Sequence, residues 1–244
     1  MNYKAVLQYD GTRYRGWQTQ GNTDNTIQGK LETLLTKMAG EPVEVNGSGR
    51  TDAGVHAAGQ VISFRCKTKE SPEEICRYMN EYLPEDIAVL TVEEAAPRFH
   101  ARLNAVRKTY VYRIWNAPVR NVFRRRFTTW IQKPLDLDAM EQAATLLCGT
   151  HDYRAFCSMK KFKKSTVRTI EKIEIGKMGQ EIRISYTGDG FLYHMVRILT
   201  GTLVEVGLGL RKPEEMTEIL EGQDRTKAGR RMPPEGLTLE SVEY

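Results

Sequence analysis

The stretch Gly49-Arg50-Thr51-Asp52-Ala53-Gly54-Val55-His56-Ala57 sets one carboxylate in a loop of small residues, two positions after an arginine. Apolar patterning predicts one strand before this loop, from Val43 to Asn46, and another after it, from Gln60 to Arg65. Glycines at 47, 49 and 54 allow the backbone to turn and to approach a ligand closely. Because loops held between strands often carry chemistry, Asp52 is the first candidate for a functional residue.

Outward from this loop, the first half of the chain predicts alternating strands and helices. Tyr3 to Tyr9 has the pattern of a strand, and Thr26 is the expected cap of a helix that ends at Gly40. Ser71-Pro72-Glu73-Glu74 is a capping box that opens a second helix. A strand from Ile87 to Val92 closes the half. The predicted order is therefore strand, helix, strand, strand, helix, strand.

The second half predicts the same order with longer connections. The expected elements are a strand at 108–115, a helix at 137–147, strands at 168–175 and 181–186, helices at 192–206 and 213–220, and a final strand at 237–243. This pattern indicates an α+β protein of two pseudo-repeated βαββαβ halves, each a split βαβ unit. We expect an N-terminal subdomain at 1–104 and a C-terminal subdomain at 105–244. The least structured stretch should be Asn116 to Lys133.

The basic residues are unevenly distributed along the 244-residue chain. The net charge is +5, yet residues 95–135 carry ten Lys or Arg and no acid, and residues 153–170 carry six and no acid. A basic face on a mildly acidic body favours a polyanionic partner. Aromatic residues also stand among the arginines, as at Phe123 and Phe127 on either side of Arg124 to Arg126. This combination suits RNA, although a solvated charged loop is the alternative interpretation.

The four cysteines indicate neither a disulfide scaffold nor a firm metal site. They stand at 66, 76, 148 and 157, with no Cys-x-x-Cys pair, as expected for reduced thiols in the cytoplasm. Cys148, His151 and Cys157 raise the question of zinc, but no fourth ligand stands near them, so we predict no metal. The N-terminus has no apolar core of the secretory kind, and His194, Arg197 and Glu205 interrupt the most apolar run. We therefore expect neither export nor a membrane span.

Five segments, in order along the chain, carry a resemblance to one family. Around the 49–57 core, they are Tyr9-Asp10-Gly11-Thr12-Arg13-Tyr14-Arg15-Gly16-Trp17-Gln18, Arg107-Lys108-Thr109-Tyr110-Val111-Tyr112, Gly149-Thr150-His151-Asp152-Tyr153, Gly188-Asp189-Gly190-Phe191-Leu192-Tyr193-His194-Met195-Val196-Arg197 and Pro233-Pro234-Glu235-Gly236-Leu237. Together they resemble the tRNA pseudouridine synthase A family. Departures at Tyr14, Tyr153, Asp189 and Met232 touch no position that the family uses for catalysis.

The resemblance implies the pseudouridine synthase fold, with two RRM-like halves that form a continuous, mostly antiparallel sheet flanked by helices around a basic cleft. It also implies an isomerase that converts uridine to pseudouridine at positions 38, 39 and 40 of the tRNA anticodon stem-loop. Nothing is oxidised or reduced overall, so no cofactor is expected. Members act as homodimers in which one tRNA touches both subunits, so tRNA and a second copy are the expected partners.

The resemblance assigns Asp52 as the essential nucleophile or base. This carboxylate must stay ionised under a covering base, although burial alone would raise its pKa. A nearby guanidinium favours the charged form, because it can donate two hydrogen bonds and stays protonated. Arg50 could reach Asp52 from the same loop, and the resemblance adds Arg197 from the second half. The alternative for Arg197 is a surface cation on an amphipathic helix. His56 is interpreted as a residue that orders the loop.

The target base requires a binding surface, and the resemblance assigns it to Tyr110 and Leu237. Tyr110 would stack on the uracil, whereas Leu237 belongs to the tail that closes the pocket. Packing in the core is a live alternative for Tyr110, because Tyr112 has the same strand parity and would point the same way.

The expected RNA contacts are basic residues spread over both halves: Arg13, Arg15, Arg102, Arg107, Arg124, Arg125, Arg126, Lys160, Lys161, Lys163 and Lys164. Two other functions remain open at this point. One is a non-catalytic RNA-binding protein on the same scaffold, and the other is an RNA hydrolase that uses Asp52 with water.

Overall fold

Strand β1 (Asn2–Tyr9) shows how the sequence produces the fold, because its side chains alternate between a buried and a more open face. In this computed structural model, which describes residues 1–159 and 161–244, Tyr3 and Leu7 point into the core and are at most 1% exposed. The Tyr3 ring stacks on Phe64 of β3 (His56–Arg65) with centroids 5.4 Å apart. This face is covered by helices and builds the first core.

Two compact units make up the chain, one of residues 1–106 with 238–244 and the other of residues 107–237. In the first unit the strand order is β4-β1-β3-β10, where β4 is Ile87–Glu94 and β10 is Leu237–Glu243, and β2 (Val45–Gly47) also pairs with β3. Strands β1, β2 and β4 run antiparallel to their partners, whereas β10 pairs with β3 in parallel. The final seven residues thus pack with the first hundred.

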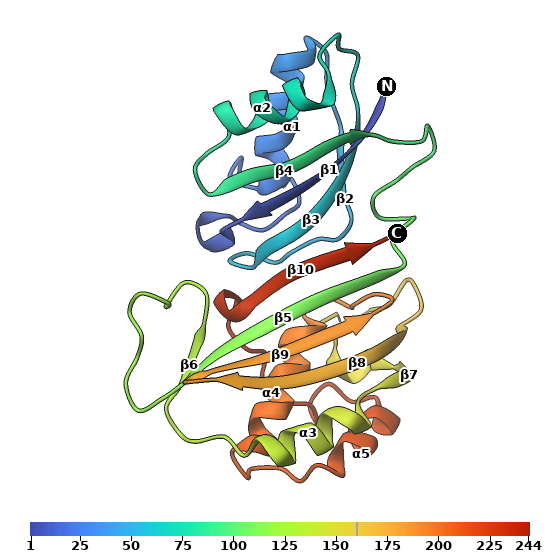
Figure 1. The fold of residues 1–244 in the computed structure, drawn as a ribbon. Coiled ribbons are helices and arrows are strands. Elements are labelled where there is room, and N and C mark those ends of the chain that lie inside the picture. The colour runs from blue at the N-terminus through green and yellow to red at the C-terminus, as the bar shows by residue number, and fades with distance from the viewer. Residues whose placement is uncertain (160) are drawn as a thin grey trace. The chain divides into compact units, whose positions relative to one another are not determined.

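Helices α1 (Ile27–Ala39) and α2 (Pro72–Tyr82) lie against one side of this sheet (Figure 1). Thr26 caps α1 by accepting a hydrogen bond from the N–H of Gly29, and Gly40 ends the helix with φ +71°. The capping box at Ser71 and Glu74 opens α2. Both helix starts predicted from the sequence are confirmed.

In the second unit the strand order is β5-β9-β8-β7, formed by Arg107–Asn116, Glu181–Gly188, Val167–Met178 and Gly149–Asp152. These strands pair antiparallel, and the short β6 (Thr129–Ile131) runs parallel to β5. Helices α3 (Leu137–Leu146), α4 (Met195–Gly207) and α5 (Glu215–Gly222) gather on one side of this sheet (Figure 1). The α+β class and the mostly antiparallel strands are confirmed.

Three short connections are 3₁₀ helices: η1 (Gly11–Arg13), η2 (Tyr153–Phe156) and η3 (Pro234–Gly236). In the described part of the chain, no helix is both long and apolar enough to cross a membrane.

The structure corrects three details of the sequence prediction. Helix α4 begins at Met195 and not at Leu192, because His194 has φ +64° and a left-handed residue interrupts a right-handed helix. Strands β6 and β7 were not predicted, since three or four residues are too short to establish a period. Residues 116–133 are accordingly more structured than expected.

The α2 capping box gives a stability prediction. Replacing Ser71 with Ala removes the acceptor for the Glu74 N–H and should lower the free energy of unfolding by about 1 kcal/mol. Ser71→Asp is the matched control, because aspartate also caps helices, and it should stay within about 0.5 kcal/mol of the wild type. Urea denaturation of the three proteins measures the difference, and equal loss in both variants would contradict a capping role.

Candidate functional site

Asp52 lies in the turn that connects β2 to β3, on a partly exposed stretch of backbone. The N–H of Val55 donates to the Asp52 carbonyl over 3.1 Å, and Gly54 has φ +79°. A non-glycine residue rarely adopts that conformation, which explains the glycine at 54. Asp52 is thus the first residue of a tight turn whose central residues are Ala53 and Gly54.

A buried tyrosine supports the turn next to Asp52. The hydroxyl of Tyr9 lies 2.8 Å from the hydroxyl of Thr51, and the Thr51 carbonyl accepts from the N–H of Trp17 over 3.0 Å. Burial raises the pKa of Tyr9 to about 12, so this hydroxyl keeps its proton at neutral pH. The residue before Asp52 is therefore fixed through both its side chain and its backbone.

A second buried group fixes the start of the same loop. The Gln60 amide donates to the Gly49 carbonyl over 3.0 Å, and its oxygen accepts from the Ser48 hydroxyl over 2.6 Å. Gln60 and Ser48 are fully buried. Because a buried amide that loses its partners costs free energy, these bonds strongly favour one loop conformation.

The first loop of the chain packs against the far end of this turn. Nδ1 of His56 accepts from the N–H of Gly11 over 3.1 Å and lies 3.2 Å from Oδ1 of Asp10. A Cβ on Gly11 would stand 1.9 Å from the Val55 carbonyl oxygen, so only glycine fits there. His56 orders two loops, in agreement with its interpretation from the sequence.

Arg50, Arg13 and Arg15 have exposed side chains in the first unit. Arg13 donates to Oδ2 of Asp86 over 2.7 and 2.9 Å, and the Tyr14 hydroxyl donates to the other oxygen of that carboxylate. Burial and the Asp86 carboxylate raise the pKa of Tyr14. Arg13 is thus tied to the protein surface by an ion pair, whereas Arg102 is exposed on the 95–106 connection.

Arg197 is only 6% exposed and lies in α4, where Glu205 alone is not buried. Its Nε donates to the carbonyl of Met232 over 2.7 Å, and the N–H of Met232 donates back to the Arg197 carbonyl over 3.1 Å. This burial excludes the surface-cation interpretation. Because both bonds use the Met232 backbone, they do not depend on which side chain stands at this position.

The residues just before α4 also contact the segment that contains Met232. Nη1 of Arg231 lies 3.0 Å from Nδ1 of His194, and the His194 ring stacks on Tyr193 with centroids 3.6 Å apart. Arg231 precedes Met232, so this contact connects the helix start to the segment that receives the Arg197 hydrogen bond.

Tyr110 and Tyr112 share a face of β5 but have different surroundings. Tyr112 is fully buried, and its hydroxyl lies 2.6 Å from that of Thr129 and 2.7 Å from the Pro233 carbonyl. Tyr110 is 8% exposed, and the edge of its ring meets Phe191 with centroids 5.2 Å apart. Tyr112 is a core residue, whereas Tyr110 packs with an aromatic residue of the 188–197 segment.

Leu237 is 5% exposed and follows η3 directly. A Cβ on Gly236 would stand 2.7 Å from the Tyr112 ring, so the 233–237 segment lies close against β5.

The basic residues of the second unit fall into two groups. Arg107 donates to Glu171 over 2.7 Å, and Arg124 forms an ion pair with the buried Glu181, which also accepts from Arg183. Arg125, Arg126, Lys161, Lys163 and Lys164 have exposed side chains. Lys160 lies outside the described residues. Arg107 and Arg124 therefore form ion pairs within the protein, whether or not they also contact a ligand.

The residues of the possible zinc site, Cys148, His151 and Cys157, do not form a metal-binding group in the structure. Nε2 of His151 lies 2.9 Å from the Cys148 carbonyl, and burial raises the pKa of the Cys148 thiol. Across the described ranges, no group of three or more His, Cys, Asp or Glu could hold a metal ion.

Comparison with known proteins places the chain in a family. The family model described as tRNA pseudouridine synthase matches residues 5–104 and 143–244. The chain belongs to the tRNA pseudouridine synthase family. It is 48% identical over 243 residues to tRNA pseudouridine synthase A of Bacillus sp. (strain KSM-64), covering 100% of this chain and 99% of that protein. It is 47% identical over 241 residues to the Brevibacillus brevis protein of the same name, covering 99% and 98%.

Among solved structures, a Cbf5-Nop10-Gar1 complex is similar with a TM-score of 0.41 and 11% identity, over 97% of this chain and 48% of that one. That similarity is too low to assign fold or function. The family match includes Arg50, Asp52, Arg197 and Leu237. It does not include Tyr110 or Arg124 to Arg126, which fall between the two matched ranges.

Sequence reasoning missed the residues that support the Asp52 turn. Tyr9 and Gln60 have the pattern of ordinary strand residues, and Met232 binds Arg197 through its backbone N–H and carbonyl alone. For Tyr9 and Gly11 the signal was present, since both belong to the 9–18 segment that resembles the family.

The contact between Gly11 and Val55 gives a second prediction. Gly11→Ala forces a backbone shift beside the turn and should lower the free energy of unfolding by about 1–3 kcal/mol, with a matching loss of turnover. Gly21→Ala is the control, because nothing lies within 4 Å of its Cβ position. Thermal unfolding and an activity assay measure both, and a wild-type result for Gly11→Ala would contradict the close packing.

Proposed function

We propose that this chain isomerises uridine to pseudouridine at positions 38, 39 and 40 of the anticodon stem-loop of tRNAs, with Asp52 as the essential nucleophile or base. The observation that carries the proposal is the Asp52 turn, which is fixed by buried Tyr9 and Gln60 and lies within the matched family range. A reacting group must be held in one geometry to contribute to catalysis, and this network does so.

The reaction is a balanced rearrangement of one nucleotide. The bond from ribose C1′ to uracil N1 breaks, the detached base rotates, and a bond from C1′ to C5 forms. C5 then loses its proton and N1 gains one. No electrons enter or leave overall, so the protein has to supply a charged group, a base-binding surface and a proton path without a cofactor.

Asp52 has to be ionised to act in this reaction. In the proposed site, Arg50 and Arg197 favour the carboxylate form through opposite charge, because removal of water alone would favour the neutral acid. The hydrogen bond from Nε of Arg197 to the Met232 carbonyl supports this role, since it fixes the direction of the guanidinium. A lysine would provide the charge without the planar, two-donor geometry.

Tyr110 is proposed to stack on the target uracil, and Leu237 to close the pocket over it. A base has to leave its stack to reach such a site, which costs a few kcal/mol and is cheapest in loops and at helix ends. An anticodon stem-loop is therefore a suitable substrate. Acceptance of three neighbouring positions requires recognition of RNA shape more than of base sequence.

The proposed RNA contacts are the basic side chains Arg13, Arg15, Arg102, Arg107, Arg124, Arg125, Arg126, Lys160, Lys161, Lys163 and Lys164. The support for those from Arg102 onward is the absence of acids from 95–135 and from 153–170, whereas Arg13 and Arg15 have exposed side chains in the 9–18 segment. We further propose that the protein works in the cytoplasm as a homodimer, and that 1–104 carries the catalytic turn while 105–244 completes the site and the RNA-binding face.

Asp52→Asn tests the proposed chemistry. It removes the charge and keeps the shape, so turnover should fall by about 10³-fold or more while tRNA affinity stays within a few-fold. Release of tritium from tRNA labelled at uridine C5 measures turnover, and filter binding measures affinity. Asp24→Asn, which changes an exposed acid of the same unit, is the control and should retain full activity.

Other outcomes of that experiment would replace the proposal. Full turnover in Asp52→Asn would remove Asp52 from the mechanism. Tight tRNA binding without tritium release by the native chain would leave a non-catalytic RNA-binding protein. Free uracil or cut strands, visible by chromatography, would indicate a hydrolase.

The salt dependence of binding tests the exposed arginines. The double variant Arg125→Gln with Arg126→Gln should bind tRNA more weakly and reduce the slope of log affinity against log salt by roughly one unit per lost phosphate contact. Arg77→Gln on α2, where acids surround the arginine, should leave the slope unchanged. An unaltered slope in the double variant would return this run to the solvated-loop interpretation.

A further inference from the structure

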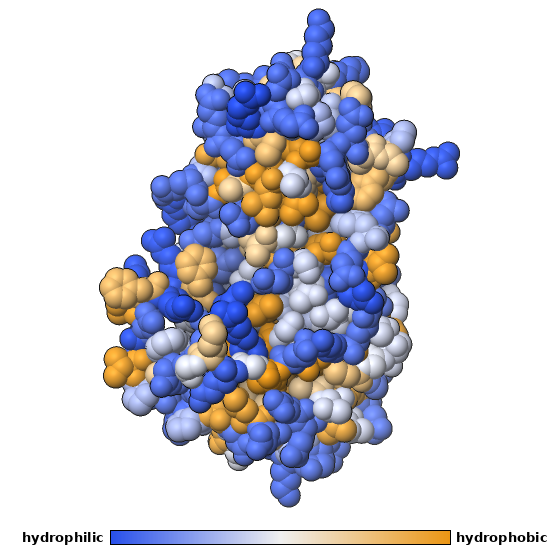
Figure 2. Space-filling view, viewed as in Figure 1, coloured by the Kyte–Doolittle hydropathy of each residue, from blue (hydrophilic) through white to orange (hydrophobic). Residues whose placement is uncertain are grey.

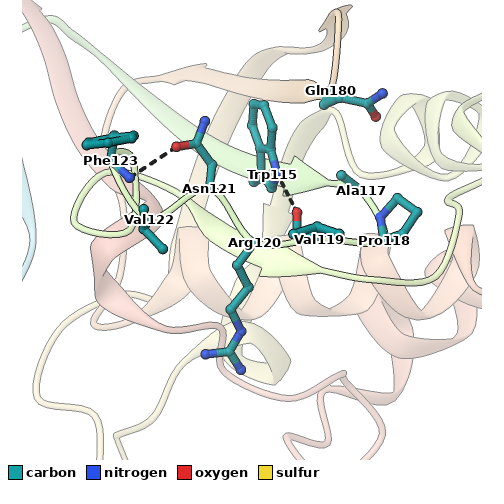
Figure 3. Close-up of a pocket in the computed structure, with 9 residues that line it drawn as sticks. All are labelled: Trp115, Ala117, Pro118, Val119, Arg120, Asn121, Val122, Phe123 and Gln180. Carbon is teal, nitrogen blue, oxygen red and sulfur yellow. Dashed lines mark hydrogen bonds between the residues drawn. The ribbon is translucent and has the colours of Figure 1, made fainter.

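The loop between β5 and β6 surrounds a hollow of about 430 Å³ (Figure 3). Its lining consists of Trp115, Ala117, Pro118, Val119, Arg120, Asn121, Val122, Phe123 and Gln180. All but Gln180 lie between the two ranges that match the family model. The family match therefore covers only Gln180 of this lining.

The base of the loop is fixed by two indole groups. Nε1 of Trp115 donates to the Val119 carbonyl over 3.0 Å, as the dashed line in Figure 3 marks. Nε1 of Trp130 donates to the Ala117 carbonyl over 2.9 Å. Both bonds are from side chains of paired strands to loop backbone, so the loop keeps its shape without a ligand.

The tip of the loop is fixed as well. The side chain of Asn121 accepts from the N–H of Phe123 over 3.1 Å, and the hydroxyl of Thr128 donates to the Arg124 carbonyl over 3.1 Å. The ion pair of Arg124 with Glu181 holds the following residues against β9. These contacts give the loop one defined conformation.

This ordered loop nevertheless exposes large apolar side chains. Phe123 is 94% exposed, Val119 75% and Val122 58%. Figure 2 shows apolar and charged side chains intermingled where the loop protrudes from the molecule. A rigid surface that holds an aromatic ring in water beside a hollow has the properties of a docking site.

Charge selects the occupant. Residues 117–127 include Arg120, Arg124, Arg125 and Arg126 and no acid, and the buried Glu181 of β9 pairs with both Arg124 and Arg183. A second copy docked through the same face would oppose these arginines to their own counterparts, and like charges in contact are unfavourable. A polyanion has the opposite charge. The exposed Phe123 ring then narrows the choice, because nucleic acids combine phosphates with flat bases.

We propose that this hollow binds an unpaired nucleobase of tRNA other than the target uridine. Phe123 stacks on that base, and Arg125 and Arg126 contact the adjoining phosphates. Arg120 has a supporting role, since it points away from the hollow in Figure 3 and its guanidinium lies 4.5 Å from the Trp130 ring. The inference rests on the proposed function only in taking tRNA as the ligand.

Binding of an unmodified tRNA transcript tests this site, with every variant made in the Asp52→Asn protein so that turnover plays no part. Phe123→Ala should weaken affinity by roughly tenfold, as expected for the loss of one stacked base. Phe123→Trp should restore affinity, and Phe123→Leu should not, because leucine is apolar but has no ring. Leu210→Ala, which removes another apolar side chain that is 74% exposed, should bind as the parent does.

Three results would overturn the proposal. Unchanged tRNA affinity in Phe123→Ala would exclude stacking, and so would equal tRNA affinity of Phe123→Leu and Phe123→Trp. A change from dimer to monomer in sedimentation of Phe123→Ala, with tRNA affinity restored at high protein concentration, would assign the surface to contact between copies. Failure of the proposed function is seen separately, as tRNA turnover by the Asp52→Asn protein in the tritium assay.

Discussion

The candidate site depends on the buried hydrogen bonds that hold the Asp52 turn. The hydroxyl pair of Tyr9 and Thr51 and the amide of Gln60 bind the turn from two neighbouring strands, where water does not compete. Because each of these groups would be costly to leave unpaired, the turn has one favoured conformation. The position of the carboxylate follows from the packing of β1 and β3.

Glycine and backbone contacts recur wherever segments approach closely. Gly11 leaves space for the Val55 carbonyl, and Gly54 adopts the positive φ that the turn requires. In the second unit, Nε of Arg197 donates to the backbone carbonyl of Met232. Such a contact depends on the position of the backbone at residue 232 and not on its side chain.

The second unit combines structural and exposed cations in one basic stretch. Arg124 forms an ion pair with a buried glutamate, whereas the Arg125 guanidinium donates to the Val122 carbonyl, next to the exposed ring of Phe123. A run of three arginines in sequence therefore contains residues with different tasks. The indole N–H groups of the two tryptophans donate to backbone carbonyls of the loop. Aromatic residues of this region therefore stabilise the loop as well as forming its exposed surface.

The sequence by itself determined the α+β class, the helix caps at Thr26 and Ser71, the family and the candidate carboxylate, because these depend on local periodicity and on contiguous residues. Only the tertiary structure decided that β10 pairs with β3, that Tyr9 and Gln60 support the Asp52 turn, and that Glu181 binds Arg124. Those contacts join residues far apart in the chain, and their hydrogen-bonding partners leave no pattern in neighbouring positions. His194 also could not be identified from the sequence. It adopts a left-handed conformation directly before α4, and because it is not a glycine, nothing in the sequence indicated that the helix begins after it.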